Sequence, residues 1–210
     1  MVDCDLKNSN IALHLGLYDF PLTLQDVLEQ DINFLESIYI HSSGLRIVPA
    51  SLSLREFKTE IAKLKNVLDG MNQHFLLDTP SGINEDVVSV LKLCNEIVVI
   101  TTPDIPSLTD SMKTIQMAKD LGKRVKGIIV NRVEMKNEIK IEDIERVCGL
   151  PVIGVVPEDK NMKRSLHLKV PLVRCKPHSS SAVAIKKIAA NLIERDYSPP
   201  WHYRIRSLFG

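Results

Sequence analysis

Strand-like and helix-like segments alternate along most of this 210-residue chain. The strand-like segments are short runs of β-branched residues, each ending in a polar or proline-containing loop. Such alternation is typical of a doubly wound α/β fold, in which helices cover both faces of a mostly parallel sheet. Loops at the carboxyl ends of the strands then gather at one edge, where ligands bind. We expect strands at 2–3, 45–50, 74–78, 96–101, 125–131 and 152–156, and helices at 10–17, 22–28, 54–68, 84–93, 105–121, 141–147 and 179–195.

Composition narrows the class of protein. An apolar content of 44% allows one large α/β domain, which we expect over residues 1–197. A net charge of +1 gives no nucleic-acid signature, and the six scattered histidines make a metal cluster improbable. No apolar run reaches the roughly 20 residues of a spanning helix, and the four cysteines contain no paired motif. We therefore expect a soluble, cytoplasmic protein with reduced thiols.

Three acidic residues mark a candidate phosphate and metal site. Asp3 and Asp5 stand one residue apart at the end of a strand, so both side chains point to the same side. Asp78 stands at the end of another apolar strand, the one predicted at 74–78. Acids at the ends of two neighbouring strands can hold Mg²⁺ and orient an attacking water in phosphoryl transfer. The alternative is that Asp3 and Asp5 only cap the helix expected at 10–17.

The turn Asp78-Thr79-Pro80-Ser81-Gly82 is typical of a Walker-B strand followed by a switch loop. Proline fixes the turn, and Gly82 lets the backbone approach a terminal phosphate. The alternative is an ordinary strand-to-helix turn, because Pro-Ser-Gly is common turn chemistry.

The usual companion of a Walker-B strand is not found in this sequence. A P-loop reads G-x-x-x-x-G-K-[ST]. Gly122 is the only glycine that precedes a lysine here, and it lacks both the upstream glycine and the hydroxyl residue. By sequence, the chain therefore carries the Walker-B half of a nucleotide-binding site without the P-loop half.

Five motifs, in order and at the right spacing, resemble the MinD/ParA family of deviant-P-loop ATPases, most closely its archaeal MinD-like branch. The resemblance runs from Met1 through the last core helix. The motifs are Asp3-Cys4-Asp5-Leu6-Lys7-Asn8-Ser9-Asn10 (switch I), Ser42-Ser43-Gly44 with the strand to Ala50, Asp78 to Gly82 (Walker B and switch II), Asn131-Arg132-Val133, and Gly154-Val155-Val156-Pro157-Glu158-Asp159.

The resemblance implies a SIMIBI-type P-loop NTPase fold and roles for individual residues. It implies that Asp5 orients the hydrolytic water and that Asp78 and Asp3 serve Mg²⁺. It places Asn10 and Gly82 on the nucleotide, and Asn131, Arg132, Pro157 and Glu158 around its base. It also implies ATP-dependent dimerisation and membrane binding in cell division or a related positioning process, with a protein activator or cargo.

The family opens with a strand, a P-loop, a helix and a second strand, of which this sequence supplies only the last few residues. We therefore expect the first βα unit to be missing through a misplaced start, a truncation or a split gene, and no ATPase activity from these residues alone. The alternative is a non-enzymatic regulator or scaffold that pairs with an intact homologue.

Residues 198–210 form a tail that begins at Ser198-Pro199-Pro200. On a helix its apolar side chains would fall on one stripe flanked by two arginines, as in an interfacial membrane helix. This predicts a peripheral location at the inner face of the cell membrane. The alternative is a tail that docks on its own core or frays. The predicted membrane residues are Trp201, Arg204, Ile205, Arg206, Leu208 and Phe209.

Overall fold

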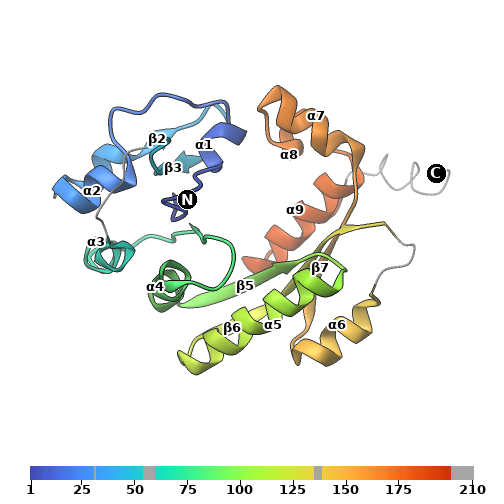
Figure 1. Cartoon of the computed structure of the whole chain (residues 1–210). Helices are drawn as coiled ribbons and strands as arrows, with labels where there is room; N and C mark the ends of the chain where they lie inside the picture. Colours follow the sequence, from blue (N-terminus) through green and yellow to red (C-terminus); the bar gives the residue numbers. More distant parts are fainter. Residues whose placement is uncertain (31, 54–59, 135–138, 200–210) are drawn as a thin grey trace. The chain divides into compact units, whose positions relative to one another are not determined.

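The computed structural model describes residues 1–30, 32–53, 60–134 and 139–199 (Figure 1). The chain forms two compact units. Unit 1 comprises Met1–Ile97 with Met117–Arg124, and unit 2 comprises Val98–Gln116 with Val125–Gly210. The predicted tail residues 201–210 and part of the helix predicted at 54–68 lie outside the described residues.

Unit 1 is built on a parallel pair of short strands. β1 (Val2–Asp3) pairs with β4 (Leu77–Asp78), and Val48 bridges to the other side of β1. β2 (Tyr39–Ile40) and β3 (Arg46–Ile47) form an antiparallel hairpin, whose turn contains Gly44 at φ +86°. The helices around them are α1 (Ile11–His14), α2 (Leu24–Gln30), η1 (Phe34–Ser37), η2 (Ile61–Lys63), α3 (Leu64–Leu68) and α4 (Glu85–Leu93).

Most of a three-stranded sheet belongs to unit 2, in the order β5 (Glu96–Thr101), β6 (Arg124–Val133), β7 (Val152–Pro157). β6 and β7 are parallel. Figure 1 shows α9 (Ser180–Leu192) on one side of this sheet, with α5 (Ile105–Asp120) and α6 (Ile141–Cys148) on the other. A Cβ at Gly154 would come within 2.3 Å of Ile188, so glycine there lets α9 lie close against β7. α7 (Lys160–Leu168) and α8 (Leu172–Cys175) precede α9.

The predicted α/β class with parallel strands is confirmed, and the differences are local. The helix predicted at 10–17 is only the four residues of α1, because Gly16 turns left-handed at φ +72°. The final helix ends at Leu192 instead of 195, and Glu194 takes φ +54°. The strand predicted at 74–78 is only Leu77–Asp78. The elements that the pattern missed are β2, η1, α7 and α8.

Among the described residues β4 pairs only with β1, and β5 pairs only with β6, so each of these two strands has an edge without a strand partner. Beside these edges, Leu76 is 66% exposed and Ile100 is 64% exposed. Strands of a helix-covered parallel sheet are ordinarily buried on both faces. Each unit therefore presents apolar strand surface that the described chain leaves uncovered. The described chain also contains no helix long and apolar enough to cross a bilayer.

Candidate functional site

The two strand-end acids of unit 1 are directly opposite each other. Asp3 on β1 and Asp78 on β4 are register partners in the parallel ladder, as the sequence predicts for acids at neighbouring strand ends. Asp3 is 1% exposed, whereas Asp78 is accessible to solvent. The pair therefore combines one internal acid with one that a ligand can reach.

Asp3 is held by hydrogen bonds from its own loop. Its carboxylate accepts from the Ser9 hydroxyl at 2.8 Å and from the Asp5 backbone N–H at 3.2 Å. A backbone hydrogen bond from Ile11, the first residue of α1, also acts on it. Asp3 thus supports the start of α1, as the capping alternative predicts, while it lies beside Asp78.

Burial and the negative charge of neighbouring acids raise the pKa of both Asp3 and Asp78. For Asp3, burial raises the pKa, and hydrogen bonds from Ser9 and Asp5 only partly offset this. For Asp78, burial raises the pKa, and the charges of Asp3 and Asp5 raise it further, while His14 lowers it. Ionised acids in such an arrangement cost the folded state free energy, which a bound cation would recover.

The loop after β1 is ordered by its own polar contacts. Asp5 accepts from the Asn8 backbone N–H at 2.9 Å, and the Lys7 ammonium donates to Asp86 in the first turn of α4 at 2.6 Å. Asn10 precedes α1 without capping it, so its exposed side chain makes no cap hydrogen bond. Sequence reasoning did not foresee the link between Lys7 and Asp86, because the pair is 79 residues apart.

Gly82 takes a left-handed backbone conformation. Its φ is +83°, and a Cβ there would meet nothing within 4 Å. Glycine is therefore required by the backbone angle, and the space beside it is open. Two residues later Asn84 caps α4 by accepting from the Val87 N–H at 3.0 Å.

In unit 2 the two predicted base-side loops are joined to each other. The Arg132 guanidinium donates to Glu158 at 2.9 Å, and the Glu158 backbone N–H donates to the Val133 carbonyl at 3.0 Å. Arg132 has φ +61°, an uncommon conformation for a residue with a side chain. Asn131 accepts from the Arg132 N–H at 3.0 Å, which supports this bend.

Asp159 is a site-supporting residue that sequence reasoning did not single out. It is 8% exposed and caps α7 by accepting from the Asn161 N–H at 2.8 Å, and it also accepts from the Ser181 N–H at 3.4 Å. Burial alone would raise the pKa of Asp159, but hydrogen bonds from Asn161, Ser179 and Ser181 outweigh it and lower the pKa. The Ser181 hydroxyl donates to the Pro157 carbonyl at 2.6 Å, so this network fixes the loop that carries Pro157 and Glu158. The sequence could have indicated this role, because aspartate is a favoured N-cap residue directly before a helix.

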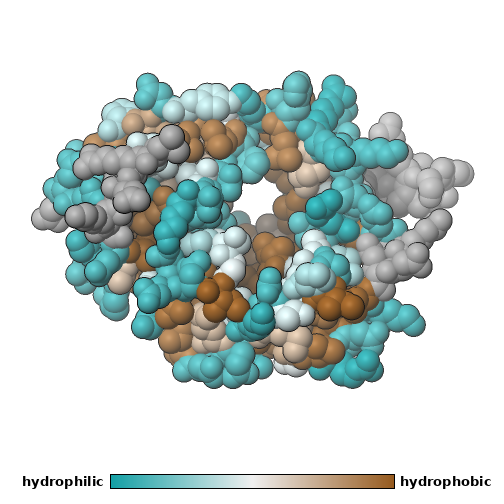
Figure 2. Space-filling model, in the orientation of Figure 1, coloured by the Kyte–Doolittle hydropathy of each residue, from teal (hydrophilic) through white to brown (hydrophobic). Residues whose placement is uncertain are grey.

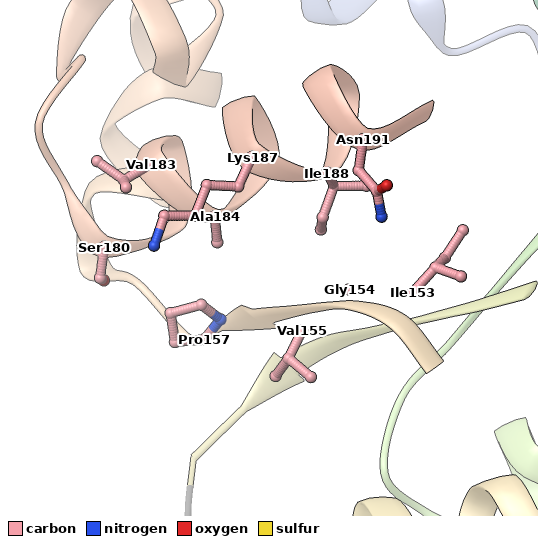
Figure 3. Close-up of a pocket in the computed structure, with 10 residues that line it drawn as sticks. All are labelled: Ile153, Gly154, Val155, Pro157, Ser180, Val183, Ala184, Lys187, Ile188 and Asn191. Carbon is pink, nitrogen blue, oxygen red and sulfur yellow. The ribbon is translucent and has the colours of Figure 1, made fainter. Parts of the chain in front are cut away.

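A cavity of about 490 Å³ lies between β7 and α9 (Figure 3). Aliphatic side chains such as Val183 and Ile188 line it together with the polar side chains of Ser180, Lys187 and Asn191. Of the predicted site residues only Pro157 lines it, so this cavity does not coincide with either set of predicted ligand residues.

The predicted residues therefore gather in two sets, one in each unit. Asp3, Asp5, Asn10, Asp78 and Gly82 lie at the ends of the paired strands β1 and β4 of unit 1 or in the loops after them. Asn131, Arg132, Pro157 and Glu158 lie at the ends of β6 and β7 in unit 2 or just after them. The model of the CobQ/CobB/MinD/ParA nucleotide-binding domain matches residues 1–172. The chain belongs to this family. The order of motifs found in the sequence is thus the order of a MinD/ParA nucleotide-binding domain.

Relatives of this MinD/ParA chain include ATP-binding and cell-division proteins. It is 35% identical over 202 residues to an uncharacterised ATP-binding protein of Methanocaldococcus jannaschii, covering 94% of this chain and 76% of that protein. The cell division ATPase MinD of Pyrococcus furiosus has a TM-score of 0.85 and 31% identity, covering 92% of this chain and 84% of that one. The MinD of Pyrococcus horikoshii complexed with Mg-ADP has a TM-score of 0.84 and 30% identity, covering 91% and 81%.

The residues of unit 1 fit a magnesium ion only in part. Mg²⁺ typically takes one or two protein carboxylates and completes its shell with waters and substrate phosphates. The accessible Asp78 beside Asp3 offers such carboxylates, but no group of three acids, histidines or cysteines able to hold a metal occurs in the described chain. Metal binding here would therefore depend on phosphate oxygens.

Proposed function

We propose that this chain is the larger part of a MinD-like ATPase that binds ATP with Mg²⁺, dimerises and acts at a membrane in spatial positioning. The register pairing of Asp3 with Asp78 carries the proposal. Burial and like charge raise the pKa of both acids, so the fold retains them at a cost in stability. A scaffold without phosphate chemistry has no need for that arrangement.

In this proposal unit 1 handles the phosphate end of the nucleotide. Mg²⁺, when bound, neutralises phosphate charge and polarises the terminal phosphoryl group. Asp78 and Asp3 would be the carboxylates that hold the metal, and Asp5 would accept a hydrogen bond from the attacking water. The open backbone at Gly82 lets its N–H meet the terminal phosphate, and the uncapped Asn10 side chain contacts the nucleotide.

The residues that the resemblance assigns to the base all belong to unit 2. The amide of Asn131 can donate to and accept from a base edge, which suits adenine. The ion pair between Arg132 and Glu158 holds this loop against the one that carries Pro157. Arg132 and Glu158 then position the loops and flank the base, and Pro157 offers it an apolar surface.

Phosphate binding in the proposed MinD-like site also needs a P-loop, and these 210 residues do not contain one. We propose that a strand–P-loop–helix segment from outside them pairs with the open edge of β4. Leu77 lies on that strand, and Leu76 beside it is 66% exposed, an apolar side chain that such a segment would cover. If the gene encodes a P-loop in frame upstream of Met1, the P-loop segment and this chain are parts of one polypeptide.

A second candidate function rests on the same open edge. A P-loop-less regulator or scaffold would use its exposed strands to pair with an intact homologue and would hydrolyse nothing. It predicts binding to such a homologue without any dependence on Asp5 or Asp78.

Membrane binding is assigned to the tail by the amphipathic pattern of residues 201–210. Two arginines contribute only about 1 kcal/mol each near anionic lipid. Nucleotide-dependent dimerisation would double the number of tails and raise avidity. Dimer and membrane states would thereby be linked through ATP.

The deciding experiment restores the P-loop. The opening strand–P-loop–helix–strand segment of the Pyrococcus furiosus MinD is fused ahead of Met1, and phosphate release from Mg-ATP is measured. The fusion should hydrolyse ATP and the unfused chain should not. In the fusion, Asp5→Asn or Asp78→Asn should lower the rate by about 100-fold or more.

Asp19→Asn is the matched control, because Asp19 is an exposed acid of unit 1 outside both loops. It should leave the rate unchanged. A fusion with a native circular dichroism spectrum that binds no nucleotide would refute the ATPase proposal and favour the regulator.

A further inference from the structure

Basic residues are concentrated in one stretch of unit 2. Residues 160–193 contain eight lysines and arginines and no aspartate or glutamate. The whole chain carries a net charge of +1, so all other residues together carry −7. The overall neutrality of the chain therefore conceals one strongly positive segment, which comprises α7, α8 and α9.

Helix geometry gathers part of this charge on one face of α7. Lys160, Lys163, Arg164 and His167 stand at i, i+3, i+4 and i+7 and share that face. All four are exposed, while the buried Ser165 faces the opposite way and its hydroxyl donates to the Val170 carbonyl at 2.6 Å. We call these four residues the basic stripe.

No acid of the described chain neutralises the cations of the basic stripe. The ion pairs of the described residues involve other lysines and arginines, such as Lys7 and Arg132. Asp159 is next to the stripe in sequence, but its carboxylate is engaged by Asn161 and Ser181. The stripe is therefore available to an anionic partner.

Exposed apolar side chains flank the basic stripe. Leu166 is 44% exposed, Leu168 is 49% exposed and Val170 is 37% exposed. By helix position Leu166 adjoins Lys163, and Leu168 adjoins Arg164 on the other margin. In Figure 2 the surface over α7 is largely hydrophilic, with hydrophobic residues at its margin.

We propose that the outer face of α7 is a membrane-binding surface for anionic phospholipid, distinct from the tail. Lysine and arginine would meet lipid phosphates while the leucines enter the headgroup region, the combination typical of interfacial helices. Residues 160–193 contain no phenylalanine, tyrosine or tryptophan for stacking on nucleic-acid bases, and exposed leucines add nothing on a phosphate backbone. The surface rests on the membrane role proposed above but uses different residues.

The test measures binding of the full chain to phosphatidylserine-containing vesicles and to pure phosphatidylcholine vesicles. The stripe variant combines Lys160→Gln, Lys163→Gln and Arg164→Gln. It should lose about 100-fold in affinity for the anionic vesicles, since each cation contributes about fivefold. Pure phosphatidylcholine should bind weakly in every case.

The matched control removes three exposed lysines of unit 1, by Lys63→Gln, Lys92→Gln and Lys119→Gln. It has the same net charge as the stripe variant and should retain most of the binding. Equal losses in the two variants would overturn the proposal. A native circular dichroism spectrum of each variant shows that the loss is not unfolding, and Leu166→Ser, which changes no charge, should weaken binding independently.

Phe209→Asp separates this surface from the tail. If only the stripe variant loses binding, the α7 surface binds the membrane as proposed and the membrane role assigned to the tail is wrong. If only Phe209→Asp loses binding, the α7 proposal is wrong and the tail assignment stands. Loss of duplex DNA binding by the stripe variant, with vesicle binding unchanged, would assign the stripe to nucleic acid and overturn the proposal.

Discussion

At the scale of single residues, the fold gives the strand-end acids different environments. Asp3 is enclosed and hydrogen-bonded by Ser9, whereas Asp78 remains accessible beside it. The sequence predicts that the two lie together, because adjacent parallel strands end at one edge. It does not predict which is buried, because this depends on Ser9 and the turn into α1.

Replacing Asp78 should stabilise the chain. In the folded state the pKa of Asp78 lies above its ordinary value of 3.8. The protonated acid therefore contributes its full stability below pH 3.8, and this contribution is lost as the pH rises through the raised pKa. Asp78→Asn should therefore increase the free energy of unfolding at pH 7, and the gain should shrink as pH falls toward 3.8. Urea unfolding across this pH range measures it.

Asp19→Asn serves again as the control, because it makes the same change at an exposed acid of unit 1 away from Asp78. A loss of stability in Asp78→Asn at neutral pH would mean that the acid is a structural residue. The site interpretation would then lose its main support.

At the scale of elements, the clearest difference from the sequence prediction is α7. Residues 160–168 carry no continuous apolar stripe, so periodicity gives no helix there. The helix is instead started by the Asp159 cap and ended at Lys169, which has φ +54°. Apolar strands such as β5, in contrast, have the bounds that the sequence predicts.

Asp159→Ala should destabilise the chain by about 2 kcal/mol, because it removes a helix cap and leaves the Ser181 N–H of the same network without its acceptor. The pKa of Asp159 is lowered, so its stabilisation is present above the ordinary value of 3.8 and disappears as pH falls through the lowered pKa. Thermal unfolding at several pH values would show both effects.

Asp159→Asn keeps an oxygen that can cap α7 and should recover much of the loss. Equal destabilisation by alanine and asparagine would indicate that charge, and not the cap, holds this loop.

At the scale of the whole molecule, each of the two units has a strand edge that the described chain does not cover. Along a strand, successive residues direct their N–H and C=O groups to opposite edges, and this alternation shows which groups of β4 face the open edge. The carbonyls of Leu76 and Asp78 accept from the N–H groups of Val2 on β1 and of Cys4 just after it. The N–H of Leu77 between them therefore points to the open side.

Fusing a P-loop segment should therefore protect the Leu77 amide. We expect its hydrogen exchange to slow by at least about tenfold, because an edge amide gains a strand partner. Hydrogen exchange read by NMR on the fused and unfused chains measures this, with the already bonded Cys4 amide as the internal reference. An unchanged Leu77 rate in a folded, nucleotide-binding fusion would mean that the segment pairs elsewhere.

The sequence by itself determined the α/β class and the family, and it predicted which loops carry the chemistry. Strand and helix periodicity and the spacing of Asp5, Asp78 and Asn131 are local properties, and local properties can be read along a chain. Only the tertiary structure decided the burial of Asp3, the pairing of Arg132 with Glu158, the network of Asp159 and the exposed stripe on α7. Those depend on side chains brought together from distant positions and on which surfaces remain in contact with water.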